Sequence, residues 1–157
     1  MSEPFVECQT VLAMLDANLD QLRKIAEEFP EEKLWERPRP EIVSLGNLIC
    51  HVAGSMRDWL ENGMAGGDWE RDRAAEFQRE GSYTRQEVLS HLDKTRRRCQ
   101  PLLDAIDAET WTAPRQFRGK PFTVREILLH QLVHSAYHAG QAAFLRWLVG
   151  GLEPKSL

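Results

Sequence analysis

Hydrophobic residues recur at alternating spacings of four and three along the tract from Phe5 to Phe29, which contains neither glycine nor proline. This spacing gives an α-helix one apolar stripe and is typical of helices that pack at shallow angles in a bundle. The tract therefore predicts a first bundle helix, which Pro30 ends. Its stripe consists of Cys8, Leu12, Leu15, Leu19, Leu22, Ala26 and Phe29.

Two further tracts repeat this pattern. Ser44 is the predicted N-cap of a second helix, which runs to about Asn62 and is stopped by the glycines that begin at Gly63. A capping box at Thr84–Glu87 predicts a third helix, in which Pro101 can introduce a kink. The predicted inward positions are Leu45, Leu48, Val52, Met56 and Trp59 in the second helix, and Val88, Leu92, Thr95, Cys99, Leu102 and Ile106 in the third.

A second capping box, at Thr123–Glu126, predicts a fourth helix that runs to about Val149 and ends at the glycine pair 150–151. The stretch from Asp107 to Phe122 contains turn-forming residues and enough alternation for at most a small hairpin. A long connection from Gly63 to Tyr83 joins the second and third helices. The pattern therefore predicts an all-α four-helix bundle in a single domain that spans residues 1–157.

The fourth helix departs from the pattern at its centre. Continuing the four-three spacing from Ile127 gives four consecutive polar positions before the stripe becomes apolar again. An unpartnered polar group that is moved out of water costs on the order of a few kcal/mol, so these side chains need a binding partner. The polar positions are Gln131, His134, His138 and Gln141.

A metal ion is one such partner. His134 and His138 lie one helical turn apart on one face, an arrangement in which two imidazoles can share an ion. His51, near the middle of the second helix, is the candidate third ligand. His130 ranks below His51, because histidines at four-residue steps drift by about 40° per step around the helix, and His91 is expected on the surface.

The histidine pair could instead be hydrogen-bonded core. No glutamate follows His134, so the zinc-metalloprotease arrangement is absent, and the sequence has no glycine-rich phosphate loop, nucleophile elbow or paired CxxC. Cys50 points about 100° away from His51 on a helix, which makes a mixed cysteine and histidine site improbable.

Composition narrows the possible functions. Of the 157 residues, 42% are hydrophobic and 28% charged, as in ordinary globular proteins, and the net charge of −4 argues against nucleic acid as a partner. The chain begins with no apolar leader, so we expect a cytoplasmic protein without a membrane partner. The three widely spaced cysteines, Cys8, Cys50 and Cys99, fit reduced thiols.

The segments Ser44–Gly54 and His134–Gln141 together resemble the DinB/YfiT-like superfamily, and the resemblance covers nearly the whole chain. It implies a four-helix bundle that binds a divalent metal, zinc or nickel, through His51, His134 and His138. It also implies frequent dimers, and activities that include metal-dependent hydrolysis and transfer or isomerisation reactions with low-molecular-weight thiols. The residues and the resemblance select the same three histidines.

Three neutral imidazoles would leave a coordination position open for water or substrate. An ion there can lower the pKa of bound water, polarise a carbonyl or hold a thiolate, and the sequence does not choose among these roles. The chain is therefore interpreted as a metal-dependent hydrolase or a low-molecular-weight-thiol-dependent transferase acting on a small molecule. The alternative is a non-catalytic dimeric bundle that binds a metal or small ligand.

Other residues are candidates for supporting roles. Gln141 could fix a ligand ring or contact substrate, and Tyr137 and Asp58 are weaker candidates for the same role. Gly140 is expected to permit close helix packing, because glycine inside a helix costs about 1 kcal/mol.

The connection from Gly63 to Tyr83 is expected to rim a pocket beside the metal, since long connections often carry function. Its charge run includes Arg71, Asp72 and Arg73, which could orient a charged substrate or simply face solvent.

A homodimer is expected from the resemblance and from the tryptophans Trp35, Trp69 and Trp111, which fall in connections where a monomer would leave them partly exposed.

Overall fold

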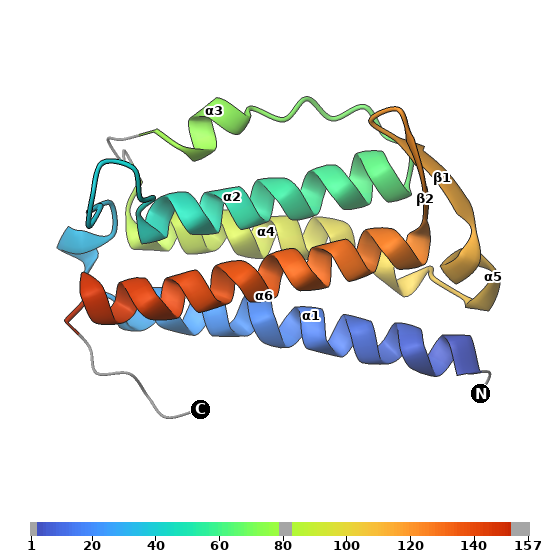
Figure 1. The fold of residues 1–157 in the computed structure, drawn as a ribbon, viewed down its shortest axis with the longest axis horizontal. Coiled ribbons are helices and arrows are strands. Elements are labelled where there is room, and N and C mark those ends of the chain that lie inside the picture. Colours follow the sequence, from blue (N-terminus) through green and yellow to red (C-terminus); the bar gives the residue numbers. More distant parts are fainter. Residues whose placement is uncertain (1–2, 79–82, 152–157) are drawn as a thin grey trace.

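The computed structural model describes residues 3–78 and 83–151, and its four long helices form a bundle (Figure 1). The all-α bundle predicted from the hydrophobic spacing is confirmed. The helices are α1 (Glu3–Glu28), α2 (Leu45–Arg57), α4 (Arg85–Asp104) and α6 (Val124–Leu148).

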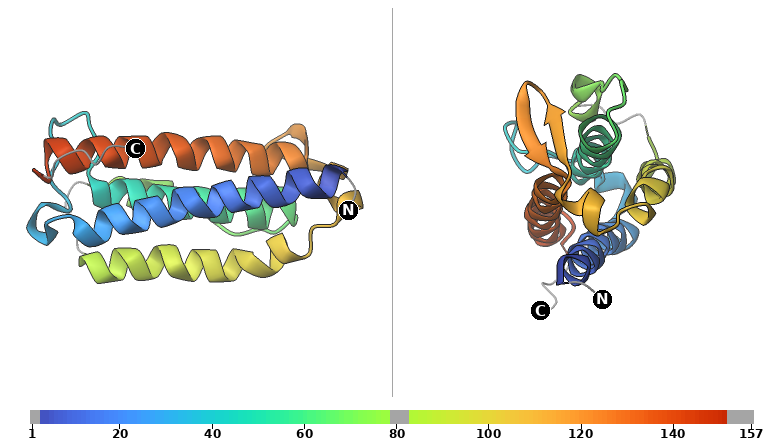
Figure 2. Two further views of the ribbon diagram at one scale, coloured as in Figure 1. Left: turned by 90° about the horizontal axis from the view of Figure 1, so that it is seen from below. Right: turned by 90° about the vertical axis from the view of Figure 1, so that its right-hand side faces the viewer.

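Seen end-on, the four helices surround one core, with α1 beside α6 and α2 beside α4 (Figure 2). Helix α2 also packs against α6, and this pairing brings the second and fourth predicted helices together. The predicted stripe of α1 is buried except for Leu12, which is half-buried. The fully buried side chains include Leu19, Leu22, Leu48, Ile49, Leu92, Ile127 and Leu128.

The N-cap predicted at Ser44 and the capping boxes predicted at Thr84 and Thr123 are confirmed, and Ser44 also forms a capping box. In each, the cap side chain accepts a hydrogen bond from the backbone N–H three residues further on. The side chain at that later position accepts a hydrogen bond from the backbone N–H of the cap residue. The pairs are Ser44 with Asn47, Thr84 with Glu87, and Thr123 with Glu126. The third helix continues through Pro101 to Asp104.

The end of the second helix differs from the prediction. The α-helical hydrogen bonding stops at Arg57, and a π-helical segment, Asp58–Met64, extends the helix beyond the predicted end at Asn62. Gly66, at φ +72°, then allows the chain to turn away. π-turns of this kind occur frequently at functional sites.

The connection between α2 and α4 contains a short helix that the sequence pattern did not predict. Helix α3 (Arg73–Glu76) begins at Asp72, whose side chain accepts a hydrogen bond from the backbone N–H of Ala75. It lies over α2 on the outside of the bundle (Figure 1). A 3-10 turn, Glu31–Lys33, follows α1.

Between α4 and α6 lie α5 (Ala108–Thr112) and a hairpin of β1 (Pro114–Phe117) and β2 (Lys120–Thr123), which pair antiparallel. The small hairpin allowed by the sequence is therefore present. Trp111 was expected to be partly exposed, but it is 1% exposed and its ring N–H donates to Glu7. The expectation for Trp111 is wrong because the short helix α5 turns the ring inward.

Within the described residues, no helix is both long enough and apolar enough to cross a membrane. The three cysteines are free thiols, as predicted.

Candidate metal centre

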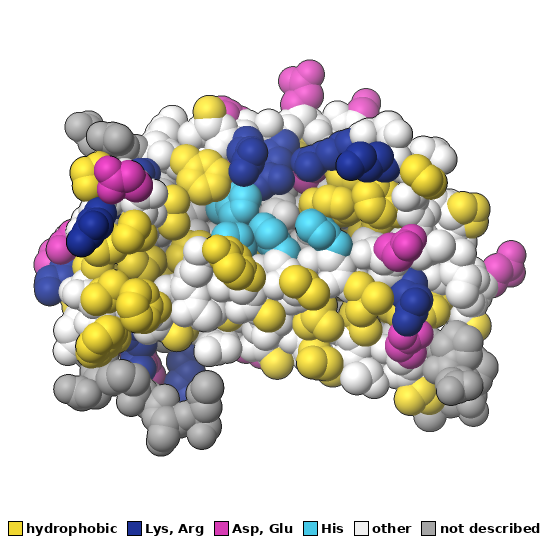
Figure 3. All heavy atoms as spheres, in the orientation of Figure 1, with side chains coloured by type: hydrophobic (Ala, Val, Ile, Leu, Met, Phe, Trp, Pro, Cys, Tyr) yellow, Lys and Arg dark blue, Asp and Glu magenta, His cyan; other side chains and the backbone are white. Residues whose placement is uncertain are grey.

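Three histidines converge between α2 and α6. The Nε2 atom of His134 lies 3.1 Å from Nε2 of His51 and 3.1 Å from Nε2 of His138. His51 is 8% exposed and the other two are half-buried. In the space-filling view the histidine side chains form one group in the middle of a face of the molecule (Figure 3). In the described part of the chain, these residues form the one cluster whose geometry could hold a metal ion.

The outer nitrogens of two rings are held by hydrogen bonds. His51 Nδ1 donates to a carboxylate oxygen of Glu76 at 2.9 Å, and His138 Nδ1 donates to Oε1 of Gln141 at 2.7 Å. A neutral imidazole carries one proton, so the Nε2 atoms of both rings present lone pairs toward the centre. If His134 Nε2 carries a proton, it can donate a hydrogen bond to only one of these two Nε2 atoms. A cation at the centre would satisfy all three, so the residues fit a divalent ion.

The electrostatic environment favours neutral imidazoles. Burial, and then the neighbouring His138 and His51, lower the pKa of His134 to about 3. Burial also lowers the pKa of His138, although its hydrogen bond to Gln141 acts in the opposite direction. Because metal ligation requires the unprotonated ring, these rings are ready to bind an ion near neutral pH.

Glu76 is the functional residue that the sequence reasoning missed. It is buried at the end of α3, and Arg71 holds it with two hydrogen bonds, of 2.6 Å from Nε to Oε1 and 2.8 Å from Nη2 to Oε2. Burial raises the pKa of Glu76, but the hydrogen bonds from His51 and Arg71 outweigh it and keep the carboxylate ionised. The helix-capping Asp72 was the available signal, since it would have placed Glu76 on a helix.

Gly54 makes room for this carboxylate. A Cβ atom built at Gly54 would lie 2.0 Å from Oε1 of Glu76, so no other residue fits while Glu76 stays in place. Gly140 was expected to allow close helix packing, but a Cβ there would meet nothing within 4 Å. That expectation is wrong, because Gly140 lies on the exposed side of α6.

The charge run of the connection is divided between the site and solvent. Arg71 has a side chain that is 9% exposed and lies behind His51, with 3.2 Å from Nη2 to Nδ1. Asp72 is exposed and caps α3, and exposed Arg73 lies over the ring of Phe77.

The two weaker supporting candidates take different positions. Buried Asp58 pairs with Arg71 at 3.6 Å and with Arg118, so it reaches the histidines only through Arg71. Tyr137 is 63% exposed, and its ring stands edge-on to His138 with 5.2 Å between the ring centres.

The two remaining histidines lie outside the cluster. His130 packs against Trp59, with 4.0 Å between ring centres, and its ring centre lies 6.0 Å from that of His134. His91 is exposed on α4, as expected.

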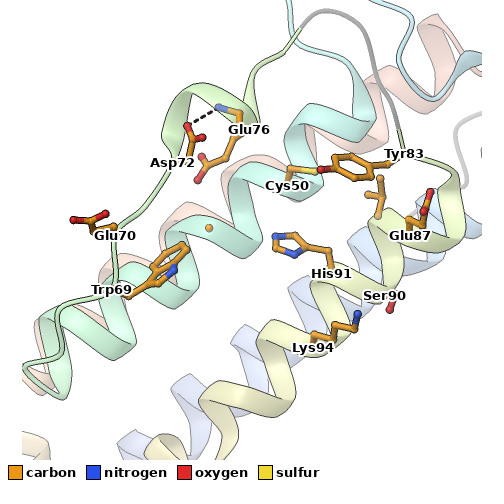
Figure 4. A pocket seen from close by; sticks show the side chains of 13 residues that line it. Cys50, Trp69, Glu70, Asp72, Glu76, Tyr83, Glu87, Ser90, His91 and Lys94 are labelled. Atoms are coloured by element: carbon orange, nitrogen blue, oxygen red, sulfur yellow. Dashed lines mark hydrogen bonds between the residues drawn. The ribbon is translucent and has the colours of Figure 1, made fainter.

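A cavity of about 480 Å³ lies between α2, α3 and α4 (Figure 4). Trp69, Glu70 and Tyr83 of the connection line it, but none of the three clustered histidines does. The predicted pocket therefore needs correction, because Glu76 and Gly54 separate this cavity from the histidines. The connection rims this cavity, and through Arg71 it also contacts His51.

We expect the metal-free protein to lose stability as pH falls. The unfolded chain takes up a proton on His134 below about pH 6.5, whereas folded His134 remains neutral down to about pH 3, so the free energy of unfolding decreases across this window. The melting temperature of chelator-treated protein should be lower at about pH 5 than at about pH 7. His134→Gln should reduce this difference in melting temperature. An unchanged difference in the variant would contradict the lowered pKa of His134.

Comparisons with known proteins give a family and a fold. The family model described as mycothiol-S-transferase matches residues 10–151. A conserved protein from Enterococcus faecalis has a similar structure, with 20% identity, a TM-score of 0.71 and coverage of 92% of this chain and 97% of that chain. A DinB-like protein from Bacillus cereus ATCC 10987 is also similar, with 16% identity, a TM-score of 0.74 and coverage of 95% and 96%. No curated protein matches the sequence.

Proposed function

The chain belongs to the mycothiol-S-transferase family of DinB-like proteins, and from this membership we propose that it is a metal-dependent S-transferase. In this proposal it joins the sulfur of a low-molecular-weight thiol, such as mycothiol, to a small electrophilic acceptor. The observation that carries the proposal is the convergence of the Nε2 atoms of His51, His134 and His138 on one point. The thiol co-substrate is inferred from the name of the family, and the three imidazoles are the candidate ligands of the ion.

The three histidines would hold zinc or nickel. A divalent ion bound there would stabilise the thiolate form of the co-substrate near neutral pH. Transfer to the acceptor would form a bond between the thiol sulfur and the electrophilic carbon, the leaving group would depart with the bonding electron pair, and the thiol proton would pass to solvent.

The remaining residues orient these groups. Glu76 and Gln141 accept hydrogen bonds from Nδ1 of His51 and His138. These bonds hold the proton of each ring on Nδ1, so that both Nε2 atoms face the centre. Phe77 and Tyr137 flank the histidines, with ring centres 4.9 Å from His51 and 5.2 Å from His138. These two rings offer an apolar border for an acceptor.

The test uses zinc- or nickel-loaded protein with mycothiol and benzyl chloride. We expect the benzyl thioether to form faster than without protein, and chelation of the metal or His134→Ala to remove the acceleration. Thioether formation is followed by mass spectrometry.

The same assay distinguishes the alternatives. Hydrolysis of para-nitrophenyl acetate by the loaded protein without thioether formation would favour a metal-dependent hydrolase. Stoichiometric metal with neither reaction would favour a non-catalytic metal-binding bundle.

We also propose that the protein is a homodimer. Helix α6 carries a stripe of large hydrophobic side chains that are between 47% and 69% exposed. Light scattering should give the mass of two chains, Phe144→Glu should lower it, and a mass of one chain at micromolar concentration would contradict the proposal. The stripe consists of Val133, Tyr137, Phe144, Trp147 and Leu148.

A further inference from the structure

Positive charge exceeds negative charge beside the histidines. Lys and Arg side chains gather along one edge of the histidine group (Figure 3). Three arginines contact the site or its bordering rings, and they face two carboxylates. Arg71 pairs with Glu76 and Asp58, and Arg118 shares Asp58. Among the residues that the structure describes, Arg73 has no acidic partner, and a bound divalent ion would add further positive charge.

Each exposed arginine is connected to the histidines through aromatic rings. The guanidinium of Arg73 lies 5.6 Å from the ring centre of Phe77, which is itself 4.9 Å from that of His51. On the hairpin side, the guanidinium of Arg118 lies 5.7 Å from the ring centre of Trp59. Trp59 packs against His130, the ring next to His134.

Both arginines have hydrogen-bond donors to spare. A guanidinium has five N–H donors, and Arg118 uses one nitrogen on Asp58 while its side chain remains 55% exposed. Arg118 stands at φ +52° in the hairpin turn, which directs it back over Trp59 and Phe117. The border of the site therefore combines flat apolar rings with cationic groups that match a carboxylate.

We infer that the acceptor is a small planar electrophile that carries a carboxylate or similar anionic group, bound by Arg73 and Arg118. This inference rests on the proposed function for the reaction, but the recognition can be measured without turnover. The ring of Phe77 would contact the planar part, and the guanidinium groups would pair with the anion.

The test compares matched anionic and neutral probes. Binding of para-toluate and para-toluamide to the zinc-loaded protein is measured by calorimetry. We expect para-toluate to bind about tenfold more tightly, and Arg73→Gln and Arg118→Gln each to weaken it about twofold to fivefold, as for partly exposed charge pairs. Arg97→Gln, an exposed arginine of α4, is the matched control and should change nothing.

The reactive counterparts, para-(chloromethyl)benzoate and para-(chloromethyl)benzamide, are then compared with mycothiol as the thiol. The ratio of kcat/KM for the anionic over the neutral acceptor should fall in both arginine variants. Failure to convert either acceptor would count against the proposed function, and the binding measurement alone would then decide the inference. Equal binding of the two probes, or para-toluate affinity unchanged in both arginine variants, would overturn it.

Discussion

Replacing His134 with alanine is expected to abolish stoichiometric zinc binding. His134 Nε2 lies 3.1 Å from the Nε2 atoms of both other histidines, so its loss leaves two imidazoles from different helices and no central ligand. Zinc sites in proteins are built on at least three protein ligands, and two rarely retain the ion through desalting. Protein incubated with excess zinc and desalted is analysed by mass spectrometry for metal; the wild type should retain about one ion per chain.

His91→Ala is the control for this experiment, because His91 is an exposed histidine outside the cluster. It should retain the ion in full. A melting curve of each variant without metal separates loss of the ligand from loss of the fold. Full retention of zinc by a folded His134→Ala protein would contradict the metal centre.

Replacing Glu76 with alanine is expected to lower zinc affinity by about tenfold to a hundredfold, the usual effect of losing a hydrogen-bond partner of a metal-bound histidine. The loss frees Nδ1 of His51 and leaves Arg71 without its main partner. Gly54→Ala should act in the same direction, because its Cβ would displace Glu76. Affinity is measured by competition with a zinc chelator.

Each of these variants has a matched control. Glu70→Ala removes an exposed glutamate of the same connection, and Gly140→Ala adds a methyl group to a helix position with free space around it. Both should bind zinc as the wild type does. Glu76→Gln, which can still accept from His51, should lose less affinity than Glu76→Ala. Unchanged affinity in both Glu76→Ala and Gly54→Ala would show that His51 needs no support from the connection.

The bundle could be predicted because its signals are local. Capping boxes and the spacing of apolar residues depend on neighbours within a few positions, and Ser44, Thr84 and Thr123 begin the helices where predicted. The histidine cluster was accessible for a related reason. Polar side chains that interrupt an apolar stripe need a binding partner. Two histidines one turn apart indicate that this partner is a metal ion.

The parts that could not be predicted depend on tertiary placement. Glu76 and His51 are 25 residues apart in the sequence and come into contact because an irregular connection folds back over α2. No periodicity in the sequence predicts this arrangement. Trp111 looked exposed because the five-residue helix that buries it is too short to leave a pattern. Gly54 and Gly140 look equivalent in sequence, and only the position of Glu76 distinguishes them.

The centre and its border come from different parts of the chain. The three histidines lie on the long helices α2 and α6, whereas Arg73 and Phe77 come from the connection and Arg118 from the hairpin. Substitutions at Arg73, Phe77 or Arg118 would therefore change which molecules bind. Glu76 and Arg71 lie in the same connection but support His51, so they would have to be kept. Natural variants of this fold could diversify their acceptors at these three positions, and a grafting experiment could exchange the three while Glu76 and Arg71 stay in place.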